Sequence, residues 1–241
     1  MTPDEFRRNG HALVDWIADY LENTADLAVT SSDEPGTVRS RLPENPPRDP
    51  EAFDAVMADL DAVIVPGLTH WQHPAFHAYF PANNSYPSIL AELLTAGLGV
   101  QGMSWNTSPA CTEVETLMLD WMQELLDLPG GFRSDSATGG GVIQGSASEA
   151  TLVSILAARW KATGGTVNAD GDTTRLVAYS TSQAHSSIEK GLRVAGIGTD
   201  RLRIVAHDSD FAMDPAALEQ QVRADRAAGL VPFWVCATRG T

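Results

Sequence analysis

The sequence predicts an α/β fold in which helices flank a mainly parallel sheet, with a helical extension at the N-terminus. Two observations predict it. From residue 141 onward, short apolar runs alternate with helical segments and are joined by short loops. This alternation is typical of a parallel sheet whose faces are covered by helices. Earlier in the chain, two amphipathic segments have little core of their own and must pack on the rest of the chain or on a second copy.

The N-terminal part is predicted to be helical. Residues 4–22 carry an apolar stripe at the helical period, and residues 50–64 carry another. The proline-rich stretch from Pro35 to Pro50 predicts an extended connection rather than a helix. Further helices are expected at 86–98 and at 109–127.

The C-terminal part is predicted to alternate between strands and helices. The expected strands are 141–144, 176–179, 202–205 and 231–237, and the expected helices are 147–162, 185–195 and 215–228. The last strand is followed only by the letters TRGT. We therefore expect a chain that is truncated in the middle of its sheet.

Composition and charge exclude several classes of partner. The 241 residues carry a net charge of −15, with a pI near 4.6. This field repels nucleic acid and anionic lipid, although a local cradle can still hold a small anion. The sequence lacks an apolar run long enough to span a membrane and a signal-peptide pattern. Cys111 and Cys236 lie far apart in apolar contexts, as expected of buried free thiols. The expected location is the cytoplasm.

The stretch GVIQGSASEATLVSILAARWK indicates a tight turn that opens a helix. Ser146 and Glu149 form an S-x-x-E capping pattern, which predicts a helix start near Ala147. Free backbone N–H groups at a helix start favour an anion such as phosphate, but an ordinary capped helix fits the pattern equally well. The P-loop and dinucleotide-binding patterns are both absent, so neither a nucleoside triphosphate nor a dinucleotide is expected.

His185 follows a predicted strand and precedes a predicted helix. It should therefore lie at the carboxyl edge of the sheet, where α/β proteins place their ligands. An imidazole there can stack on a flat ring or transfer a proton near neutral pH. A capping or buried role is the more common one for a single histidine.

The loop HWQHPAFHAYFP is rich in histidine and aromatic residues. Its three histidines do not suggest a metal site, because Pro74 breaks a common helical face and no Cys or nearby carboxylate completes a ligand set. No metal is expected. Its aromatic side chains fit either core packing or the wall of a pocket for an aromatic ligand. They are Trp71, Phe76, Tyr79 and Phe80.

Several stretches together resemble the pyridoxal-phosphate-dependent aromatic-L-amino-acid decarboxylase family, the group II decarboxylases. They are HWQHPAFHAYFPANNSYPSILAE, SWNTSPACTEVETLMLDWM, GGGVIQGSASEATLVSILAAR, VAYSTSQAHSSIEKG and GLVPFWVCATRGT. The resemblance runs over nearly the whole chain, in order and with similar spacing. It implies the cofactor pyridoxal 5'-phosphate and a subunit of the fold-type-I transferase class.

The resemblance also implies roles for individual residues. Ala147 and Ser148 would hold the cofactor's phosphate, His185 would stack on its ring and act in proton transfer, and Thr241 would lie near the cofactor. The implied substrate pocket consists of Trp71, Tyr79, Phe80, Pro81 and Ala82, with Gln101 and Met103 lent by the other subunit of a homodimer. Residues 1–85 would then be a helical dimerisation segment, and residues 86–241 the first part of the large cofactor-binding domain.

The sequence departs from the family pattern in ways that leave the substrate open. Ala82 replaces a hydroxyl residue, Gln101 and Met103 replace apolar and aromatic residues, and Arg239 interrupts an apolar position. The chain has Lys161 and Lys190, and neither stands at the position of the family's Schiff-base lysine. That lysine and the aspartate that pairs with the pyridinium nitrogen are expected beyond the end of this sequence.

The resemblance implies a lyase that decarboxylates an L-amino acid to the amine and CO2. The aromatic loop favours tryptophan, tyrosine or dihydroxyphenylalanine over glutamate. Two alternatives remain open: a catalytically incomplete fragment or pseudoenzyme of the family, and a pyridoxal-phosphate-dependent aldehyde synthase or aminotransferase.

Overall fold

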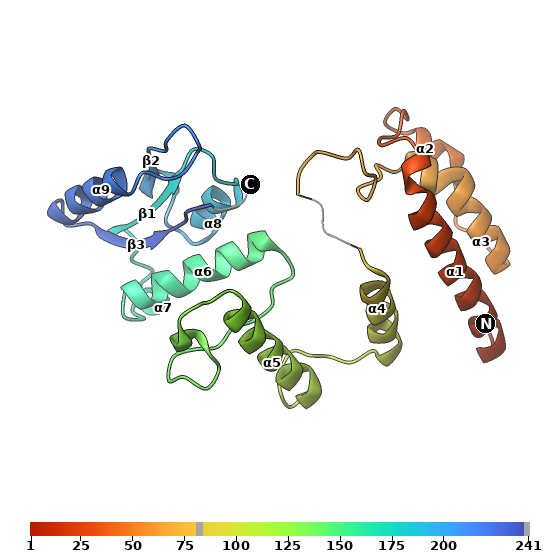
Figure 1. Ribbon diagram of the computed structural model, residues 1–241, viewed down its shortest axis with the longest axis horizontal. Coiled ribbons are helices and arrows are strands. Elements are labelled where there is room, and N and C mark those ends of the chain that lie inside the picture. Colours follow the sequence, from red (N-terminus) through yellow and green to blue (C-terminus); the bar gives the residue numbers. More distant parts are fainter. Residues whose placement is uncertain (81–83, 239–241) are drawn as a thin grey trace. The chain divides into compact units, whose positions relative to one another are not determined.

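The computed structural model describes residues 1–80 and 84–238, which fall into two compact units (Figure 1). The first unit is Met1–Val100 and the second is Gln101–Thr241. Each unit is described by itself. The functional division predicted at residues 85 and 86 stays a prediction.

The elements of the described residues follow the predicted order closely. The helices are α1 (Pro3–Asn23), α2 (Thr37–Arg41), α3 (Phe53–Asp59), α4 (Tyr86–Leu98), α5 (Pro109–Leu125), α6 (Ala147–Ala162), α7 (Val167–Asp170), α8 (Ser187–Val194) and α9 (Pro215–Ala227). The strands are β1 (Leu176–Thr181), β2 (Leu202–Val205) and β3 (Val231–Val235). Within the described residues, no helix combines the length and the apolar character that a membrane span requires.

Local capping explains why the helix starts agree with the sequence. Five helices begin after a side chain that accepts a hydrogen bond from a backbone N–H of the first turn. These side chains are those of Thr2, Ser85, Ser108, Ser146 and Asp214. Each capping residue lies next to the helix that it starts, so the helix start can be predicted from the sequence.

The prediction for the proline-rich stretch is wrong at one place. Residues Thr37–Arg41 form the short helix α2, although Pro35 to Pro50 was expected to be extended throughout. The helix fits between Pro35 and Pro43, and its own five residues contain no proline. Prolines disrupt only a helix that contains them, and here they stand on either side.

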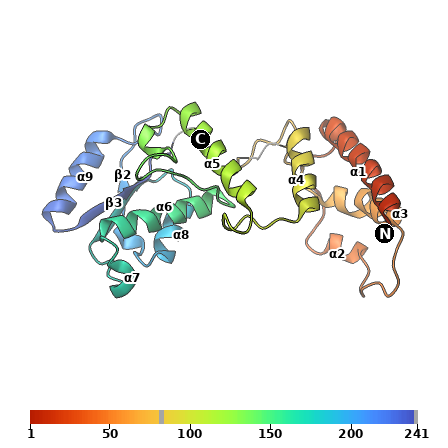
Figure 2. The same ribbon diagram turned by 90° about the horizontal axis from the view of Figure 1, so that it is seen from below.

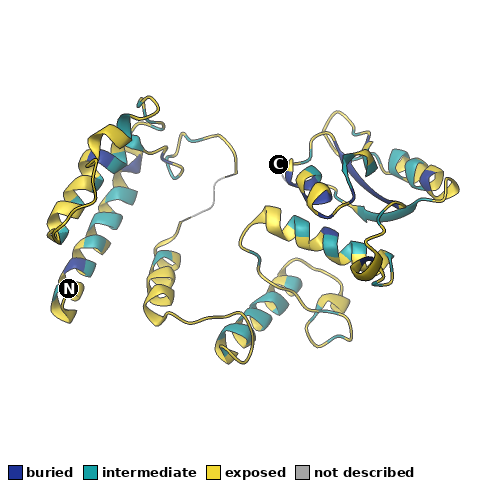
Figure 3. Cartoon of the chain, turned by 180° about the vertical axis from the view of Figure 1, so that it is seen from behind, coloured by how far each residue is buried: buried dark blue, intermediate teal, exposed yellow. Residues whose placement is uncertain are grey.

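The first unit buries few side chains. Among its described residues the buried ones are Asn9, Thr24, Val63 and His70. Figure 3 shows α4 almost wholly exposed, and the exposed side chains of this helix include Leu90, Leu93, Leu94 and Leu98. The expectation that these helices have little core of their own is therefore confirmed.

The second unit contains a three-stranded parallel sheet with β1 in the centre. The strand order is β2-β1-β3, and both neighbours run parallel to β1. The register with β3 shifts between Val177 and Ala178, so that β3 contributes one extra residue there. Pro232 lies beside this irregularity, where a residue without an N–H donor is tolerated. The predicted parallel sheet is confirmed for these strands.

Helices cover both faces of the sheet. Leu176 and Ala178 of β1 pack with α6 and α8, while Val177 and Tyr179 pack with α9 on the opposite face. Figure 2 shows the sheet between α9 and the pair formed by α6 and α8. Every residue of β1 is buried, as is typical of a central strand in a parallel sheet.

One predicted strand does not form. Gly141–Gln144 was expected to be a strand, but the described structure gives it no strand partner. Instead, the N–H of Ile143 donates to the Glu115 carboxylate at 2.7 Å, and the N–H of Gly145 donates to the Glu149 carboxylate at 3.0 Å. A strand is defined by pairing with a neighbour, which this segment lacks.

A charged hydrogen-bond network ties α9 to two strands. Asp225 of α9 accepts a hydrogen bond of 2.8 Å from the Tyr179 hydroxyl and one of 2.9 Å from the Arg203 guanidinium. Both Tyr179 and Asp225 are buried. The hydrogen bonds from Arg203, helped by that from Tyr179, lower the pKa of the Asp225 carboxyl against the opposing effect of burial. Burial raises the pKa of the Tyr179 hydroxyl, as does its bond to Asp225.

Asp225→Asn should destabilise the second unit by about 2–4 kcal/mol at neutral pH, because it leaves a partly buried guanidinium without its counter-charge. The folded-state pKa of Asp225 lies below its unfolded value, so its stabilisation is complete above about pH 4 and is lost as the pH falls through the folded-state pKa. Urea denaturation at several pH values measures the difference between the two proteins, which should shrink in acid.

Glu219→Gln is the matched control on the same helix. Glu219 pairs with Arg223 one turn away, and both side chains are largely exposed. Such surface pairs contribute about 0.5 kcal/mol or less. Equal losses for the two variants would contradict the assignment of a stabilising role to the buried network.

Candidate functional site

The N-terminus of α6 leaves backbone donors free. The hydroxyl of Ser146 accepts a hydrogen bond of 3.2 Å from the N–H of Glu149, which confirms the predicted cap. Within the described residues, the N–H groups of Ala147 and Ser148 have no hydrogen-bond partner, and both residues are exposed. Two free N–H groups and a serine hydroxyl at a helix start are a donor set that fits a phosphate.

The carboxylate of Glu149 opposes an anion at the same helix start. It accepts the hydrogen bond from the N–H of Gly145, so its negative charge is held beside the turn. A side chain at Gly145 would approach this carboxylate to 3.0 Å. The glycine therefore lets the turn close tightly around Glu149, while the N–H groups of Ala147 and Ser148 stay without a partner among the described residues.

His185 lies in the loop between β1 and α8. Its Nδ1 accepts a hydrogen bond of 3.2 Å from the N–H of Ser187 in the first turn of α8. An Nδ1 that accepts this hydrogen bond favours the tautomer whose N–H lies at Nε2. The residue is exposed, which leaves Nε2 available to a ligand. The histidine thus combines a capping role with a free donor.

The packing of α6 on α8 brings these two features to one edge of the sheet. Gly191 of α8 lies against Leu152 and Ile155 of α6. One turn further along each helix, the guanidinium of Arg159 donates to the carbonyl of Ala195 at 2.6 Å. The two helices therefore run in the same direction.

Because α8 follows directly on β1, it begins at the carboxyl end of that strand. The start of α6 lies at the same end, since α6 is parallel to α8. This is the edge at which open α/β sheets bind their ligands.

Two hydrogen bonds join β1 to Cys236, the residue that follows β3, and the sequence analysis did not predict them. The Ser180 hydroxyl donates to the carbonyl of Cys236 at 3.0 Å, and the N–H of Cys236 donates to the carbonyl of Tyr179 at 2.9 Å. The only sequence signal was that Ser180 and Cys236 each stand at the carboxyl end of a predicted strand.

The predicted aromatic residues of the first unit form a stacked group. The rings of Trp71 and Tyr79 are parallel within 9° with centroids 5.4 Å apart, and Phe76 is tilted against Trp71. Tyr79 and Phe80 are each 85% exposed. These rings are therefore available for contact with another molecule or another part of the protein. Pro81 and Ala82, also predicted for the pocket, lie outside the described residues.

For the other predicted site residues, the structure gives exposure but no contact with the proposed site. Gln101 and Met103 belong to the second unit and are exposed. Thr241 lies outside the described residues. The packing of α6 on α8 assigns the starts of both helices, and with them Ala147, Ser148 and His185, to one edge of the sheet. The aromatic group belongs to the other unit, and the two units are described separately.

The loop histidines do not form a metal site among the residues that the structure describes. No group of three or more His, Cys, Asp or Glu side chains there could hold an ion. His70 is buried, and its Nδ1 lies 2.7 Å from the hydroxyl of Tyr20. Its role is therefore to join the loop to α1.

Comparison with known proteins identifies relatives over the whole chain. Residues 35–241 match the family model of the pyridoxal-dependent decarboxylase conserved domain. The aromatic-L-amino-acid decarboxylase of Cavia porcellus is 46% identical over 248 residues, which cover 100% of this chain and 51% of that protein. The phenylacetaldehyde synthase of Arabidopsis thaliana is 45% identical over 245 residues, covering 100% of this chain and 49% of that protein.

A solved structure shows the same fold. The crystal structure of Catharanthus roseus tryptophan decarboxylase in complex with L-tryptophan superposes with a TM-score of 0.92 at 40% identity, covering 100% of this chain and 51% of that one. The chain therefore spans about half the length of the relatives it matches. The predicted fold class and the predicted resemblance are both confirmed: this chain belongs to the pyridoxal-dependent decarboxylase family, whose cofactor is pyridoxal phosphate.

Proposed function

We propose that this chain is the N-terminal half of an enzyme that decarboxylates an aromatic L-amino acid to the amine and CO2. The observation that supports the proposal is the parallel packing of α6 on α8, which assigns the free donors at the start of α6 and the loop of His185 to the same edge of the sheet. The relatives support it, because they include aromatic-L-amino-acid, tryptophan and tyrosine decarboxylases. Bound pyridoxal phosphate supplies the electron sink that stabilises charge as CO2 leaves.

In this proposal the start of α6 binds the phosphate of the cofactor. The N–H groups of Ala147 and Ser148 and the Ser148 hydroxyl donate to phosphate oxygens, and the helix dipole adds a favourable field. Glu149 keeps the turn closed by bonding Gly145 rather than by touching the phosphate. The start of α6 would thus anchor the cofactor at the carboxyl edge of the sheet.

His185 would stack on the ring of the cofactor and transfer a proton at Nε2. The hydrogen bond from Ser187 to Nδ1 holds the imidazole in one orientation and one tautomer. A ring fixed in this way can stack on a flat cofactor and present a donor to the reacting atoms. Orientation by the backbone of α8 means that no second side chain is needed to set the tautomer.

The aromatic group of the first unit is proposed to contact the substrate side chain. Trp71 and Tyr79 offer parallel exposed ring faces, with Phe80 as a further exposed ring. Aromatic walls of this kind suit an aromatic substrate. Pro81, Ala82, Gln101, Met103 and Thr241 remain proposed site residues on the resemblance alone.

We also propose a homodimer located in the cytoplasm. The exposed leucines of α4 support dimerisation, because a helix that is apolar on all sides is stable only when other surfaces cover it. The two free cysteines are compatible with a reducing compartment.

A related aldehyde synthase is the second candidate function. A phenylacetaldehyde synthase and a 4-hydroxyphenylacetaldehyde synthase are similar to this chain at 45% and 38% identity. Their identity to this chain equals that of several decarboxylases, and the chain spans only about half of their length, so the similarity is compatible with both reactions.

The two candidate functions differ in their products. They can be separated by product analysis of an enzyme in which this chain is extended to the full length of its relatives. With tryptophan, tyrosine or dihydroxyphenylalanine we expect amine and CO2 in equal amounts and no uptake of oxygen. Aldehyde released with ammonia and hydrogen peroxide, at the expense of oxygen, would replace the proposal by the synthase. An enzyme that binds pyridoxal phosphate yet releases no CO2 would leave the alternative of an inactive family member.

His185→Gln in the same enzyme should lower kcat by about 10²- to 10⁴-fold, the range expected when a positioned acid–base group is lost. The affinity for pyridoxal phosphate, measured by equilibrium dialysis, should change only a few-fold because the phosphate contacts remain. His11→Gln, at an exposed position of α1, is the control and should leave both quantities unchanged. Unaltered turnover in the His185 variant would remove this residue from the mechanism.

Ser148→Asp should weaken binding of pyridoxal phosphate at least about tenfold, because it places a negative charge where the phosphate is proposed to bind; tenfold corresponds to about 1.4 kcal/mol. Fluorescence titration with the cofactor measures the affinity without any turnover. Ala157→Asp adds the same charge in the middle of α6, at an exposed position, and should have little effect. Equal effects of the two substitutions would point to net charge rather than to a phosphate contact.

A further inference from the structure

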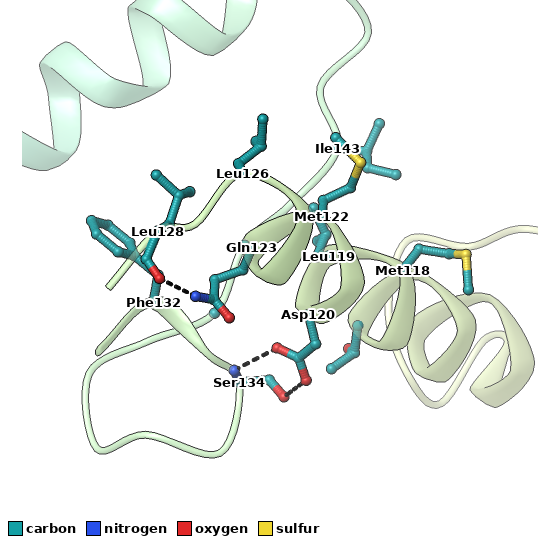
Figure 4. A pocket seen from close by; sticks show the side chains of 13 residues that line it. Met118, Leu119, Asp120, Met122, Gln123, Leu126, Leu128, Phe132, Ser134 and Ile143 are labelled. Carbon is teal, nitrogen blue, oxygen red and sulfur yellow. Dashed lines mark hydrogen bonds between the residues drawn. The ribbon is translucent and has the colours of Figure 1, made fainter. Parts of the chain in front are cut away.

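Two bonded groups of polar side chains lie beside apolar surfaces of the described residues. In the second unit, a cavity of about 580 Å³ lies against α5, where Asp120 bonds to Ser134 and the amide of Gln123 donates to a backbone carbonyl (Figure 4). None of the described residues that line this cavity is proposed to contact the cofactor or the substrate. In the first unit, by contrast, Tyr20 bonds to His70, and His70 directly precedes Trp71 of the aromatic group.

His70 is fixed to the rest of the first unit from two sides. Its N–H donates to the carbonyl of Val29 at 2.9 Å, and its Nδ1 lies 2.7 Å from the hydroxyl of Tyr20 on α1. The histidine is only 4% exposed, so water cannot readily replace either partner. Burial raises the pKa of the Tyr20 hydroxyl, which therefore keeps its proton at neutral pH.

The ring of Tyr20 has a defined position of its own. It stacks on Trp16, with the ring planes 3° apart and the centroids separated by 5.5 Å. The indole N–H of Trp16 donates to the carboxylate of Asp61 at 2.9 Å. These contacts place the Tyr20 hydroxyl, which in turn holds His70.

The turns that form the aromatic group start from His70. Its carbonyl accepts a hydrogen bond of 3.0 Å from the N–H of His73, and the carbonyl of His73 accepts one of 2.9 Å from the N–H of Phe76. These turns bring the centroid of the Phe76 ring to 5.1 Å from that of Trp71. Because Trp71 is the next residue after His70, its direction depends on how His70 is held.

Tyr79 depends on Trp71 in turn. Its φ of 57° lies in the left-handed region, which costs energy for a residue with a side chain. Its side chain is 85% exposed and stacks on Trp71 with the ring planes 9° apart. This stack favours the strained conformation, so a shift of Trp71 would let Tyr79 relax.

We propose that Tyr20 and His70 are positioning residues for the substrate. Their hydrogen bond holds the loop in the arrangement in which Trp71 and Tyr79 stack, and so sets the affinity for an aromatic side chain. The inference rests on the proposed function, in which these rings contact the substrate. If the loop takes the stacked arrangement only part of the time, the apparent affinity falls in proportion to that fraction.

Tyr20→Phe in the full-length enzyme should raise KM for its aromatic amino acid about threefold to tenfold, the effect of losing one hydrogen bond. The value of kcat should change by less than about twofold, because binding is lost equally from the substrate and the transition state. The affinity for pyridoxal phosphate should stay the same, since the proposed phosphate contacts lie in the second unit. Phenylalanine keeps the ring that stacks on Trp16, so the variant should fold.

Hydrogen exchange of the same enzyme without substrate reports on the loop itself. In Tyr20→Phe, the amides of His73 and Phe76 should exchange at least about threefold faster, because their bonds persist only while the loop is ordered. Tyr86→Phe removes a hydroxyl from an exposed tyrosine of the same unit and is the control. It should leave the exchange rates and KM unchanged.

Substitutions of His70 test the same contact from the other side. Asparagine can place a hydrogen-bonding atom close to the position of Nδ1, so His70→Asn should retain most of the affinity. His70→Leu removes this atom and should resemble Tyr20→Phe. Because both changes remove one interaction, the double variant should bind no more weakly than His70→Leu alone. Additive losses would mean that the two residues act separately, which would overturn the inference.

Two further results would overturn the inference in an active enzyme. One is a Tyr20→Phe variant with unchanged exchange at His73 and Phe76, which would mean that the hydrogen bond does not hold the loop. The other is faster exchange with an unchanged KM, which would mean that the loop does not set the affinity for the substrate. A parent enzyme that binds pyridoxal phosphate but releases no CO2 from any aromatic amino acid would instead overturn the proposed function, and the inference with it.

Discussion

The close approach of α6 to α8 is the contact on which the proposed site depends. Gly191 makes it possible, because a Cβ at that position would lie 2.8 Å from the terminal methyl of Ile155. Ile155 is completely buried, so its side chain has little room to move away. The close contact aligns the two helices in parallel over the same face of β1. Their starts then lie at one edge, so the proposed phosphate contacts and the His185 imidazole, from distant parts of the sequence, are assigned to the same edge of the sheet.

The two faces of β1 have different roles: one carries the helices of the proposed ligand site, and the other carries a stabilising charged network. On one face, apolar side chains, together with hydrogen bonds from Arg159 to Ala195 and from Trp234 to Ser154, hold α6 and α8, which position the proposed site. On the other face, Tyr179 joins the charged network of Asp225 and Arg203 and so ties α9 and β2 to the centre of the sheet. Removing one charge from a buried network is costly, so this face resists sliding of the strands. The register of β1, and with it the place of His185, is thereby held from the side opposite the ligand.

The sequence predicted the features that depend on neighbouring residues, such as helix starts. It did not predict features that depend on contacts with distant parts of the chain, such as strand pairing. Ser146 and Asp214 allowed the starts of their helices to be predicted, because a cap and its helix are adjacent in the chain. The apolar run Gly141–Gln144 has the composition of a strand, yet pairing needs a neighbour from far along the chain, and composition cannot supply one. In the same way, the position of His185 after a strand was legible, whereas its bond to Ser187 and its place beside the start of α6 depend on helix packing. The stacking of Trp71 on Tyr79 was also hidden, because Tyr79 adopts a φ of 57°, which few non-glycine residues take.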